Sequence, residues 1–303
     1  MAETDLKETG MTDEQLAAAL GQHRSKAAFG KVLTGIGMAI FLIGIFTHFA
    51  VCVIGFIVAG VGTVISGKHS EALKRQLGDE LVRGALEEVF GKVEYEPFRH
   101  ISEETAQSAG MLFPFGFNVV NGSDRIKAVY HGLNIELSDV ELVERTDYYD
   151  EETSEWKHTD KKVFSGQWLV CDFGKELSAD LRLAESAKLN RRERANSITT
   201  DNEAFNRRFV VRSENEHEAF YILTPHMMEY ILSMAQKSGG EVYMSFLRGG
   251  KLHVALASGR DLFELGSGKV DTALLRQKFA GEIRWFTGLL DELRLVDTLY
   301  RKD

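Results

Sequence analysis

The chain has little cysteine and no excess of positive charge. Its 303 residues include two cysteines, Cys52 in an apolar run and Cys171 in a predicted strand. This count excludes a framework of disulfides and fits a reducing compartment. The net charge is −9 at pH 7. Because nucleic-acid binders are normally basic, we expect no nucleic-acid partner.

The sequence also lacks the motifs that identify many catalytic and metal sites. It contains no Gly-x-Ser-x-Gly elbow, no His-Glu-x-x-His and no Cys-x-x-Cys. The stretch Gly266–Lys269 is similar to a phosphate loop, but Phe263 replaces its first glycine and Val270 its hydroxyl residue. Cys171 and His158 could pair as nucleophile and base, although an apolar strand favours a buried structural thiol. We predict no catalytic, cofactor-binding or metal-ligating residue, and no cofactor.

Charge is absent from one long stretch of the chain. Between Lys31 and Lys68 there is no Asp, Glu, Lys or Arg. As one helix this stretch would be longer than about 50 Å, whereas a bilayer core is about 30 Å thick. Split at Thr47-His48, it gives two halves of roughly 17 residues, each long enough to span. The sequence therefore predicts a two-span membrane hairpin over residues 31–68. The alternative is a helical hairpin buried in a soluble core.

Positive charge flanks this stretch on both sides. The positive-inside rule then places both termini in the cytoplasm, which predicts a multi-pass protein of the inner (cytoplasmic) membrane with the bilayer as a partner. The stretch holds no acidic or basic residue, which argues against a transporter or pump. Small residues lie four or seven apart within each half, so the hairpin can close on itself or on another copy. These residues are Gly37, Gly44, Gly55, Ala59, Gly62 and Ser66.

Composition and periodicity divide the chain into four segments. The last is a soluble domain with sub-lobes at about residues 94–187 and 203–303. Alternating apolar residues predict antiparallel strands in both sub-lobes, with helices between them, so the predicted fold class is α+β. The four segments are an N-terminal cytoplasmic segment with a short helix (1–30), the hairpin (31–68), a neck helix (69–93) and the soluble domain (94–303).

The first sub-lobe is predicted to hold strands joined by one long polar connection. Thr146–Lys162 is polar and acidic, which predicts a long, mobile hairpin loop without the spacing of a calcium site. Residues 188–202 are charged and predict a linker. Its cluster Arg191, Arg192 and Arg194 either contacts phosphate or is simply solvated, and we favour solvation. The strands are predicted over residues 126–130, 133–137, 140–142 and 163–173.

The second sub-lobe has clearer local signals. Residues 219–223 predict a strand. Thr224 and Pro225 fit the N-cap and first residue of a helix, and Gly239 fits its end. The methionine-rich face of this helix predicts core packing, with a ligand- or peptide-binding face as the alternative. The other predicted elements are a strand after residues 205–211, a hairpin over residues 242–256 and a long helix from about Asp271.

Several short motifs stand in order between about residue 70 and residue 296. They include Gly122–Ile126, Asp172–Lys175, Phe205-x-x-x-Phe209 and Leu223-Thr224-Pro225. In this order they resemble a bacterial family of membrane-associated proteins, numbered thirty-one thirty-seven among domains of unknown function. The resemblance implies a membrane hairpin, a cytoplasmic α+β domain and a LemA-type membrane protein as partner, and it implies no catalytic residues. Ser123 and Ala128 depart from the family pattern, where an acidic residue and a glycine are usual.

Three functions are compatible with these patterns. The first, which we expect, is an accessory or scaffold protein anchored in the cytoplasmic membrane that binds a protein partner through its soluble domain. The second is a membrane-associated hydrolase that uses Asp124, Asp139 and Asp172, because turns and strand ends often carry sites. Aspartates at such positions also simply form turns. The third is a lipid- or small-ligand-binding module with an apolar pocket between sheet and helix.

Overall fold

The computed structural model describes residues 25–26, 28–40, 54, 56–65, 81–172, 177–185, 189, 194, 196–264 and 272–292. The chain divides into two compact units. One unit is Met1–Leu86 with Leu265–Ala280, and the other is Glu87–Glu264 with Gly281–Asp303. The second unit holds the strands described below.

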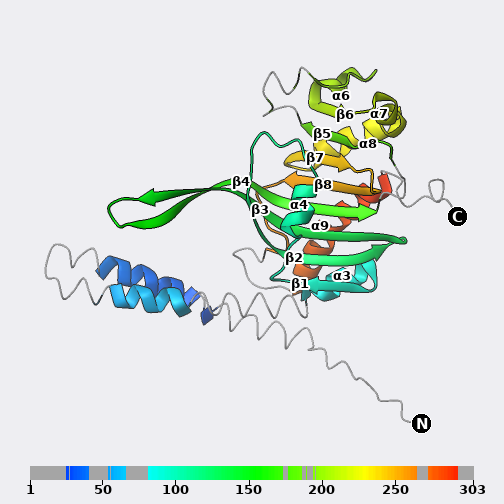
Figure 1. Cartoon of the computed structure of the whole chain (residues 1–303). Coiled ribbons are helices and arrows are strands. Elements are labelled where there is room, and N and C mark those ends of the chain that lie inside the picture. Colours follow the sequence, from blue (N-terminus) through cyan, green and yellow to red (C-terminus); the bar gives the residue numbers. More distant parts are fainter. Residues whose placement is uncertain are drawn as a thin grey trace, which may run out of the picture. The chain divides into compact units, whose positions relative to one another are not determined.

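Eight strands form one antiparallel sheet in the second unit (Figure 1). Their order across the sheet is β1-β2-β3-β4-β8-β7-β5-β6. The strands predicted for two separate sub-lobes therefore share one sheet, because β4 pairs with β8 from Gln167↔Leu256 to Asp172↔Lys251. The strands are β1 (Val93–Glu96), β2 (Val119–Tyr130), β3 (Leu133–Asp150), β4 (Glu155–Asp172), β5 (Leu181–Glu185), β6 (Phe209–Ser213), β7 (Glu241–Phe246) and β8 (Lys251–Ala257).

One face of the sheet is apolar and covered by helix. The register partners Ile126, Leu137 and Leu169 lie side by side on it, each at most 1% exposed. On the same face the hydroxyl of Tyr130 donates to a carboxylate oxygen of Asp291 in α9 (Thr272–Glu292) at 2.9 Å. The alternation of side chains along β2, β3 and β4 thus directs their apolar residues to this layer.

The opposite face carries an aromatic cluster beneath α4 (Glu103–Ser108) and the segment that follows it. Trp168 is fully buried in this cluster. The ring of Phe113 meets Trp168 edge-on at 5.9 Å and Tyr243 at 4.7 Å between centroids. Since Trp168 is on β4 and Tyr243 on β7, this cluster joins the two halves of the sheet on the face opposite the Leu137 layer.

β3 and β4 are much longer than the strands beside them. β2 pairs with β3 as far as Val143, whereas β3 and β4 continue to pair with each other out to Asp150↔Glu155. Residues 144–161 thus project beyond the sheet as a two-stranded ribbon, which we call the arm (Figure 1). The predicted mobile loop over Thr146–Lys162 is wrong, because its aromatic and threonine side chains and cross-strand ion pairs extend the ladder.

The first unit includes the described helical stretches 28–40 and 56–65. They pack closely, since a Cβ on Gly62 would lie 2.5 Å from the backbone nitrogen of Thr34. Within the described residues, none of the helices combines the length and the apolar character that crossing a membrane requires.

This finding overturns two predictions. The two-span membrane hairpin over residues 31–68 is wrong, and so is the multi-pass inner-membrane localisation inferred from it. The turn predicted at Thr47-His48 lies outside the described residues, as do residues 69–80 of the predicted neck helix. The described remainder of that neck contains α3 (Arg83–Phe90), and β1 begins at Val93.

Other elements occur near the predicted positions, with one change of type. α8 (Pro225–Lys237) has Thr224 as its N-cap, whose Oγ1 accepts from the backbone nitrogen of Met227 at 3.3 Å. Residues 219–223, predicted as a strand, belong largely to α7 (Glu216–Ile222). There the side chain of Asn215 accepts from the backbone nitrogen of His217 as the N-cap of α7. This cap favours a helix, although the short apolar run by itself favours a strand. α6 (Glu203–Arg208) precedes β6, and β7 and β8 form the predicted hairpin.

Candidate functional site

One row of register partners crosses the whole sheet on the face that carries α4. Side chains at such positions lie about 5 Å apart. All but one of them are polar or charged, so we call them the polar row. From β1 to β6 they are Glu94, Lys127, Glu136, Val170, His253, Ser245, Arg182 and Arg212.

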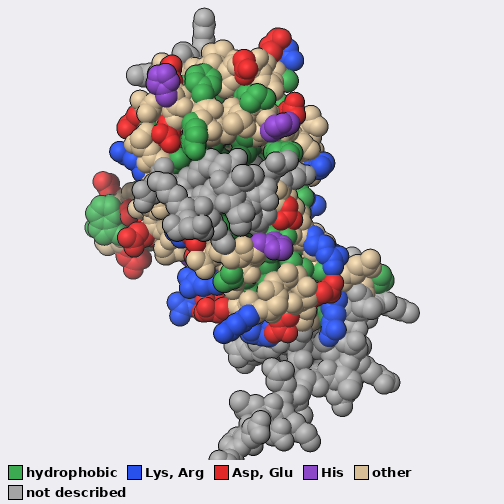
Figure 2. All heavy atoms as spheres, turned by 90° about the vertical axis from the view of Figure 1, so that its right-hand side faces the viewer, with side chains coloured by type: hydrophobic (Ala, Val, Ile, Leu, Met, Phe, Trp, Pro, Cys, Tyr) green, Lys and Arg blue, Asp and Glu red, His purple; other side chains and the backbone are tan. Residues whose placement is uncertain are grey.

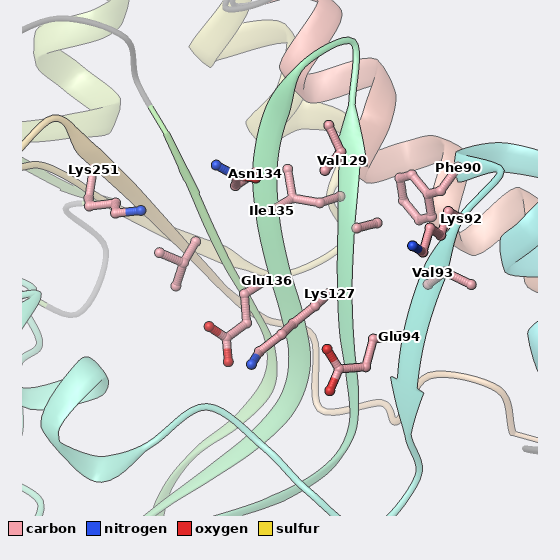
Figure 3. A pocket seen from close by; sticks show the side chains of 12 residues that line it. Phe90, Lys92, Val93, Glu94, Lys127, Val129, Asn134, Ile135, Glu136 and Lys251 are labelled. Atoms are coloured by element: carbon pink, nitrogen blue, oxygen red, sulfur yellow. The ribbon is translucent and has the colours of Figure 1, made fainter.

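A pocket of about 640 Å³ lies over the β1–β3 end of the polar row. Figure 3 shows Lys127 between Glu94 and Glu136 in its wall, with Lys92 beside Phe90. Glu136 is held by Arg125 at 2.6 Å. Lys92, Glu94 and Lys127 form no ion pair with any residue that the structure describes. The pocket therefore offers both signs of charge to a ligand.

The middle of the polar row is buried. His253 is 3% exposed, and its Nδ1 accepts from the indole nitrogen of Trp168 at 3.4 Å. Burial, and then the charge of Lys251, lower the pKa of His253 to about 4. The imidazole is therefore neutral at neutral pH and acts as a packing and accepting group, not as a proton donor.

The far end of the polar row carries two arginines. Arg182 and Arg212 are register partners on β5 and β6. A second pocket, of about 230 Å³, is lined by Arg212. Its lining combines one guanidinium with apolar walls, namely Arg212, Val210, Leu189, Met111, Leu112 and Phe113.

Two of the three aspartates considered as hydrolytic residues lie together in the core. The β2–β3 register places Ser123 opposite Asp139, and Asp124 is the next residue along β2. Asp139 is 4% exposed and accepts from Nε2 of Gln167 at 3.0 Å and from the backbone nitrogen of Leu262 at 2.6 Å. Burial raises the pKa of Asp139 to about 7 in spite of these two bonds.

These carboxylates hold the fold together. Asp124 is fully buried and accepts from the hydroxyl of Tyr95 at 2.5 Å. Neither Asp124 nor Asp139 lines either of the two pockets. Asp172 lies elsewhere, at the end of β4, where it is paired with Lys251 and accepts from Nδ2 of Asn134 at 2.7 Å. The structure thus brings Asp124 and Asp139 together and leaves Asp172 apart.

Cys171 and His158 do not meet. Both are on β4, and the residues between them span about 40 Å at about 3.3 Å per residue. Cys171 is 1% exposed, and burial raises the pKa of its thiol to about 12. It is therefore a structural thiol.

The remaining candidates give no site. Within the described residues, no group of three or more His, Cys, Asp or Glu side chains could hold a metal ion. Met228 and Met234 of α8 are buried core residues. Nε of Arg194 donates to the carbonyl of Leu189 at 3.1 Å. Gly266–Lys269 and Arg191-Arg192 lie outside the described residues.

The arm carries exposed aromatic side chains. Trp156 is 74% exposed, Tyr149 50% and Tyr148 46%. Tyr149 and Trp156 are cross-strand partners whose rings meet edge-on at 5.7 Å. On the face drawn in Figure 2, by contrast, acidic and basic side chains are interspersed and hydrophobic ones are scattered between them. Grouped exposed aromatics are typical of binding surfaces rather than of ordinary protein surface.

Sequence reasoning missed both the arm and the arginine pair. The usable signal for the arm was its aromatic and threonine content between two strand patterns. No local signal marks the arginine pair, because Arg182 and Arg212 become neighbours only through the pairing of β5 with β6.

Comparison with known proteins agrees with the resemblance. Residues 162–295 match the family model described as "Protein of unknown function (DUF3137)". No curated protein matches the sequence. Among solved structures, the mycobacterial trehalose monomycolate transport factor A, TtfA, is 13% identical, with 72% of this chain and 96% of that chain covered and a TM-score of 0.34.

Proposed function

We propose that this chain, which matches a protein family of unknown function over residues 162–295, is an accessory or scaffold protein that binds a protein partner through the arm. The observation that carries the proposal is the exposed aromatic tip formed by Trp156 and Tyr149 on a projecting ribbon. Tryptophan and tyrosine dominate the energetics of protein interfaces, because each buries a large, rigid surface at little entropic cost.

The arm is ordered before any partner binds. Arg145 holds Asp160 through two hydrogen bonds of 2.7 Å each, and Lys161 pairs with Glu144 at 3.0 Å. At its base, β3 and β4 continue into the centre of the sheet. A partner therefore meets a preformed surface, which reduces the entropic cost of association.

Charge on the arm indicates the chemistry of the partner. Between Thr146 and Thr159 the sequence has five acidic residues and one lysine. A partner with a basic surface and an apolar recess for the tip residue Trp156 is complementary to this pattern. A second copy of the arm would bring like charges together, which disfavours self-association through the arm.

The positions of the three aspartates argue against the hydrolase alternative. The aspartates on which it depends are either bound inside the core, as Asp124 and Asp139 are, or paired at a distance, as Asp172 is. A reactive carboxylate must reach its substrate, and neither pocket is lined by these groups.

Binding of a small polar ligand is a second candidate function, supported by the 640 Å³ pocket. Its volume is within the usual range for ligand sites. Lys92, Glu94 and Lys127, which form no ion pair with the described residues, favour a ligand with both charges, such as an amino acid or short peptide, over an acyl chain. Thermal stabilisation of the full chain by free amino acids or dipeptides, lost in Lys127→Ala and kept in Lys161→Ala, would support it.

Photo-crosslinking tests the partner-binding proposal. Tyr148 is replaced by p-benzoylphenylalanine in the full chain, and the producing cells are irradiated. We expect one reproducible protein crosslinked at this position, which mass spectrometry identifies. The purified partner should bind the full chain with an affinity that falls as salt is raised.

Two variants make this test specific. Trp156→Ala should weaken binding of the purified partner by about tenfold or more, because it removes a hot-spot side chain. Tyr221→Ala is the matched control, since Tyr221 is 61% exposed on α7, away from the arm in sequence and sheet order. Crosslinks confined to the chain itself, or equal binding by Trp156→Ala and Tyr221→Ala, would contradict the proposal.

A further inference from the structure

We propose that Arg182, Arg212 and Ser245 form a binding site for an oxyanion, the carboxylate or phosphate group of a small ligand, at the β5–β6 end of the polar row. The site is independent of the arm and of the 640 Å³ pocket. Three observations carry it: a side-by-side arginine pair, buried hydrogen-bonding groups without partners among the described residues, and an adjoining pocket.

The arginine pair is set by strand register. Arg182 on β5 lies opposite Arg212 on β6 and, on its other side, opposite Ser245 on β7. Register partners on one face of a sheet lie about 5 Å apart at Cβ, and like charges placed directly opposite destabilise the sheet. An anion between the two guanidinium groups would accept hydrogen bonds from both.

Asp180 contacts two of the arginines at this end of the sheet. Its Oδ2 accepts from Nη2 of Arg182 at 2.8 Å, and its Oδ1 accepts from the backbone nitrogen of Arg248 at 2.9 Å. The Arg248 guanidinium also lies 3.6 Å from Oδ1. Asp180 is therefore shared between Arg182 and Arg248, and a carboxylate oxygen of Glu214 lies 3.8 Å from the Arg248 guanidinium.

Some buried polar atoms at the site have no hydrogen-bond partner among the described residues. They include Nε of Arg182 and Oγ of Ser245. Ser245 is 0% exposed, so bulk solvent does not satisfy its hydroxyl. Buried donors without a partner are rare in folded proteins, because each loses its bonds to water and gains none in return. A bound oxyanion accepts from both groups.

The adjoining pocket explains how an anion would be held. The segment that follows α4 forms its roof: Met111, Leu112 and Phe113 line it, and a Cβ on Gly110 would lie 3.0 Å from Nε of Arg182. These apolar walls lower the local dielectric and so strengthen the attraction between guanidinium and anion. The Arg182 side chain is 31% exposed, which leaves a route from solvent.

The size and charge of the site define the ligand class. A volume of about 230 Å³ is below the range of drug-sized sites. It suits an inorganic anion or a short organic acid. The planar fork of a guanidinium matches the paired oxygens of a carboxylate or a phosphate. The neutral His253, one position further along the row, adds no competing charge.

Calorimetric titration of the full chain tests the proposal with two probes, sodium phosphate and sodium propionate. We expect saturable binding of at least one probe, and the stronger probe distinguishes phosphate from carboxylate recognition. Arg182→Gln and Arg212→Gln should each weaken it by about tenfold or more. Arg207→Gln should leave it unchanged, because Arg207 is exposed on α6 and paired with Glu203.

Two further measurements guard against loss of fold in the arginine variants. Ser245→Ala removes one hydroxyl and should weaken binding while the far-ultraviolet circular dichroism stays that of the wild type. In the wild type, the Nε–H signal of Arg182 in a nitrogen–proton spectrum should shift as the probe is added. The proposal is overturned if neither probe binds, or if the bound probe leaves that signal unmoved.

Discussion

Asp139 carries an ionisable group that the fold favours in its neutral form. Its pKa is about 7 in the folded chain, against 3.8 for an ordinary aspartate, because burial outweighs the hydrogen bonds from Gln167 and Leu262. Between about pH 4 and pH 7 the folded state therefore binds more protons at this residue than the unfolded state. The stability contributed by this residue falls as pH rises through that window, and the loss is complete above the folded pKa.

The Asp139→Asn variant removes this titration. Over the window the wild type should lose up to about 4 kcal/mol of unfolding free energy at this residue, and the variant should not. Urea denaturation at about pH 5 and about pH 7.5 measures the difference. Asp172→Asn is the control: partial burial raises the pKa of Asp172, but hydrogen bonds from Lys251 and Asn134 lower it overall. Equal pH slopes in the wild type and Asp139→Asn would refute the prediction.

Gly166 permits the close approach of β4 to the end of β8. A Cβ at this position would lie 2.0 Å from the backbone oxygen of Leu256 and 2.8 Å from the backbone nitrogen of Ser258. Gly166→Ala should therefore lower the unfolding free energy by about 3 kcal/mol, because backbone must move to admit the methyl group. Thermal unfolding measures the loss. Gly249→Ala is the control, since a Cβ there meets nothing within 4 Å, and an equal loss in both variants would contradict the argument.

At the residue scale, the sequence could identify Asp124 and Asp139 but not their roles. Polarity at a turn marks both residues, yet their burial depends on a β2–β3 pairing that shifts register between Ser123 and Ile126. A bulge of this kind has no clear local pattern. The arginine pair is beyond sequence reasoning for the same reason, because long-range pairing sets the neighbours of Arg182.

At the scale of elements, the arm depends on side chains that cross its two strands. An isolated two-stranded ribbon is only marginally stable in water. The arm adds to its ladder the bidentate Arg145–Asp160 pair and the edge-on contact of Tyr149 with Trp156. The stability of the arm therefore depends on contacts within the arm, and a substitution can destabilise the arm without unfolding the sheet.

Asp160→Ala tests this separation. Amide hydrogen exchange within residues 146–159 should speed up by about threefold, because one bidentate pair is lost. The urea midpoint of the whole chain should not change. Lys161→Ala is the matched control on the same strand, since its pair with Glu144 is more exposed and has a single contact. Exchange already at the unfolded rate in the wild-type arm would show that the ribbon is not formed in solution.

Element types were predictable where a cap or a turn fixes them. Thr224 and Pro225 mark the start of α8, and Gly239, with a φ of +69°, follows its end. Residues 219–223 were not predictable from their apolar run, since Asn215 turns them into a helix with Phe220 and Tyr221 exposed. Likewise, the polar composition of residues 146–162 favours a loop, whereas cross-strand pairs make most of these residues part of the two strands of the arm.

At the scale of the whole sheet, one seam joins the two parts that composition separates. β4 and β8 pair across it, and the Phe113 ring bridges Trp168 on β4 and Tyr243 on β7. The charged connection after residue 188 predicted a boundary between lobes, but strand order is decided by pairing between distant segments, which composition does not show. Hydropathy of residues 31–68 likewise predicted membrane spans, whereas none of the described helices is both long and apolar enough to be one.

Because of this seam, β3 and β5 should unfold as one cooperative unit. In native-state hydrogen exchange with rising urea, Leu137 on β3 and Leu183 on β5 should converge on one unfolding free energy. Leu169→Ala should lower both by the same amount, about 2–5 kcal/mol, because Leu169 is 0% exposed and lies opposite Val254 across the seam. If the variant lowers the value for Leu137 and leaves that for Leu183 in place, the two halves fold independently and the sheet has two cores.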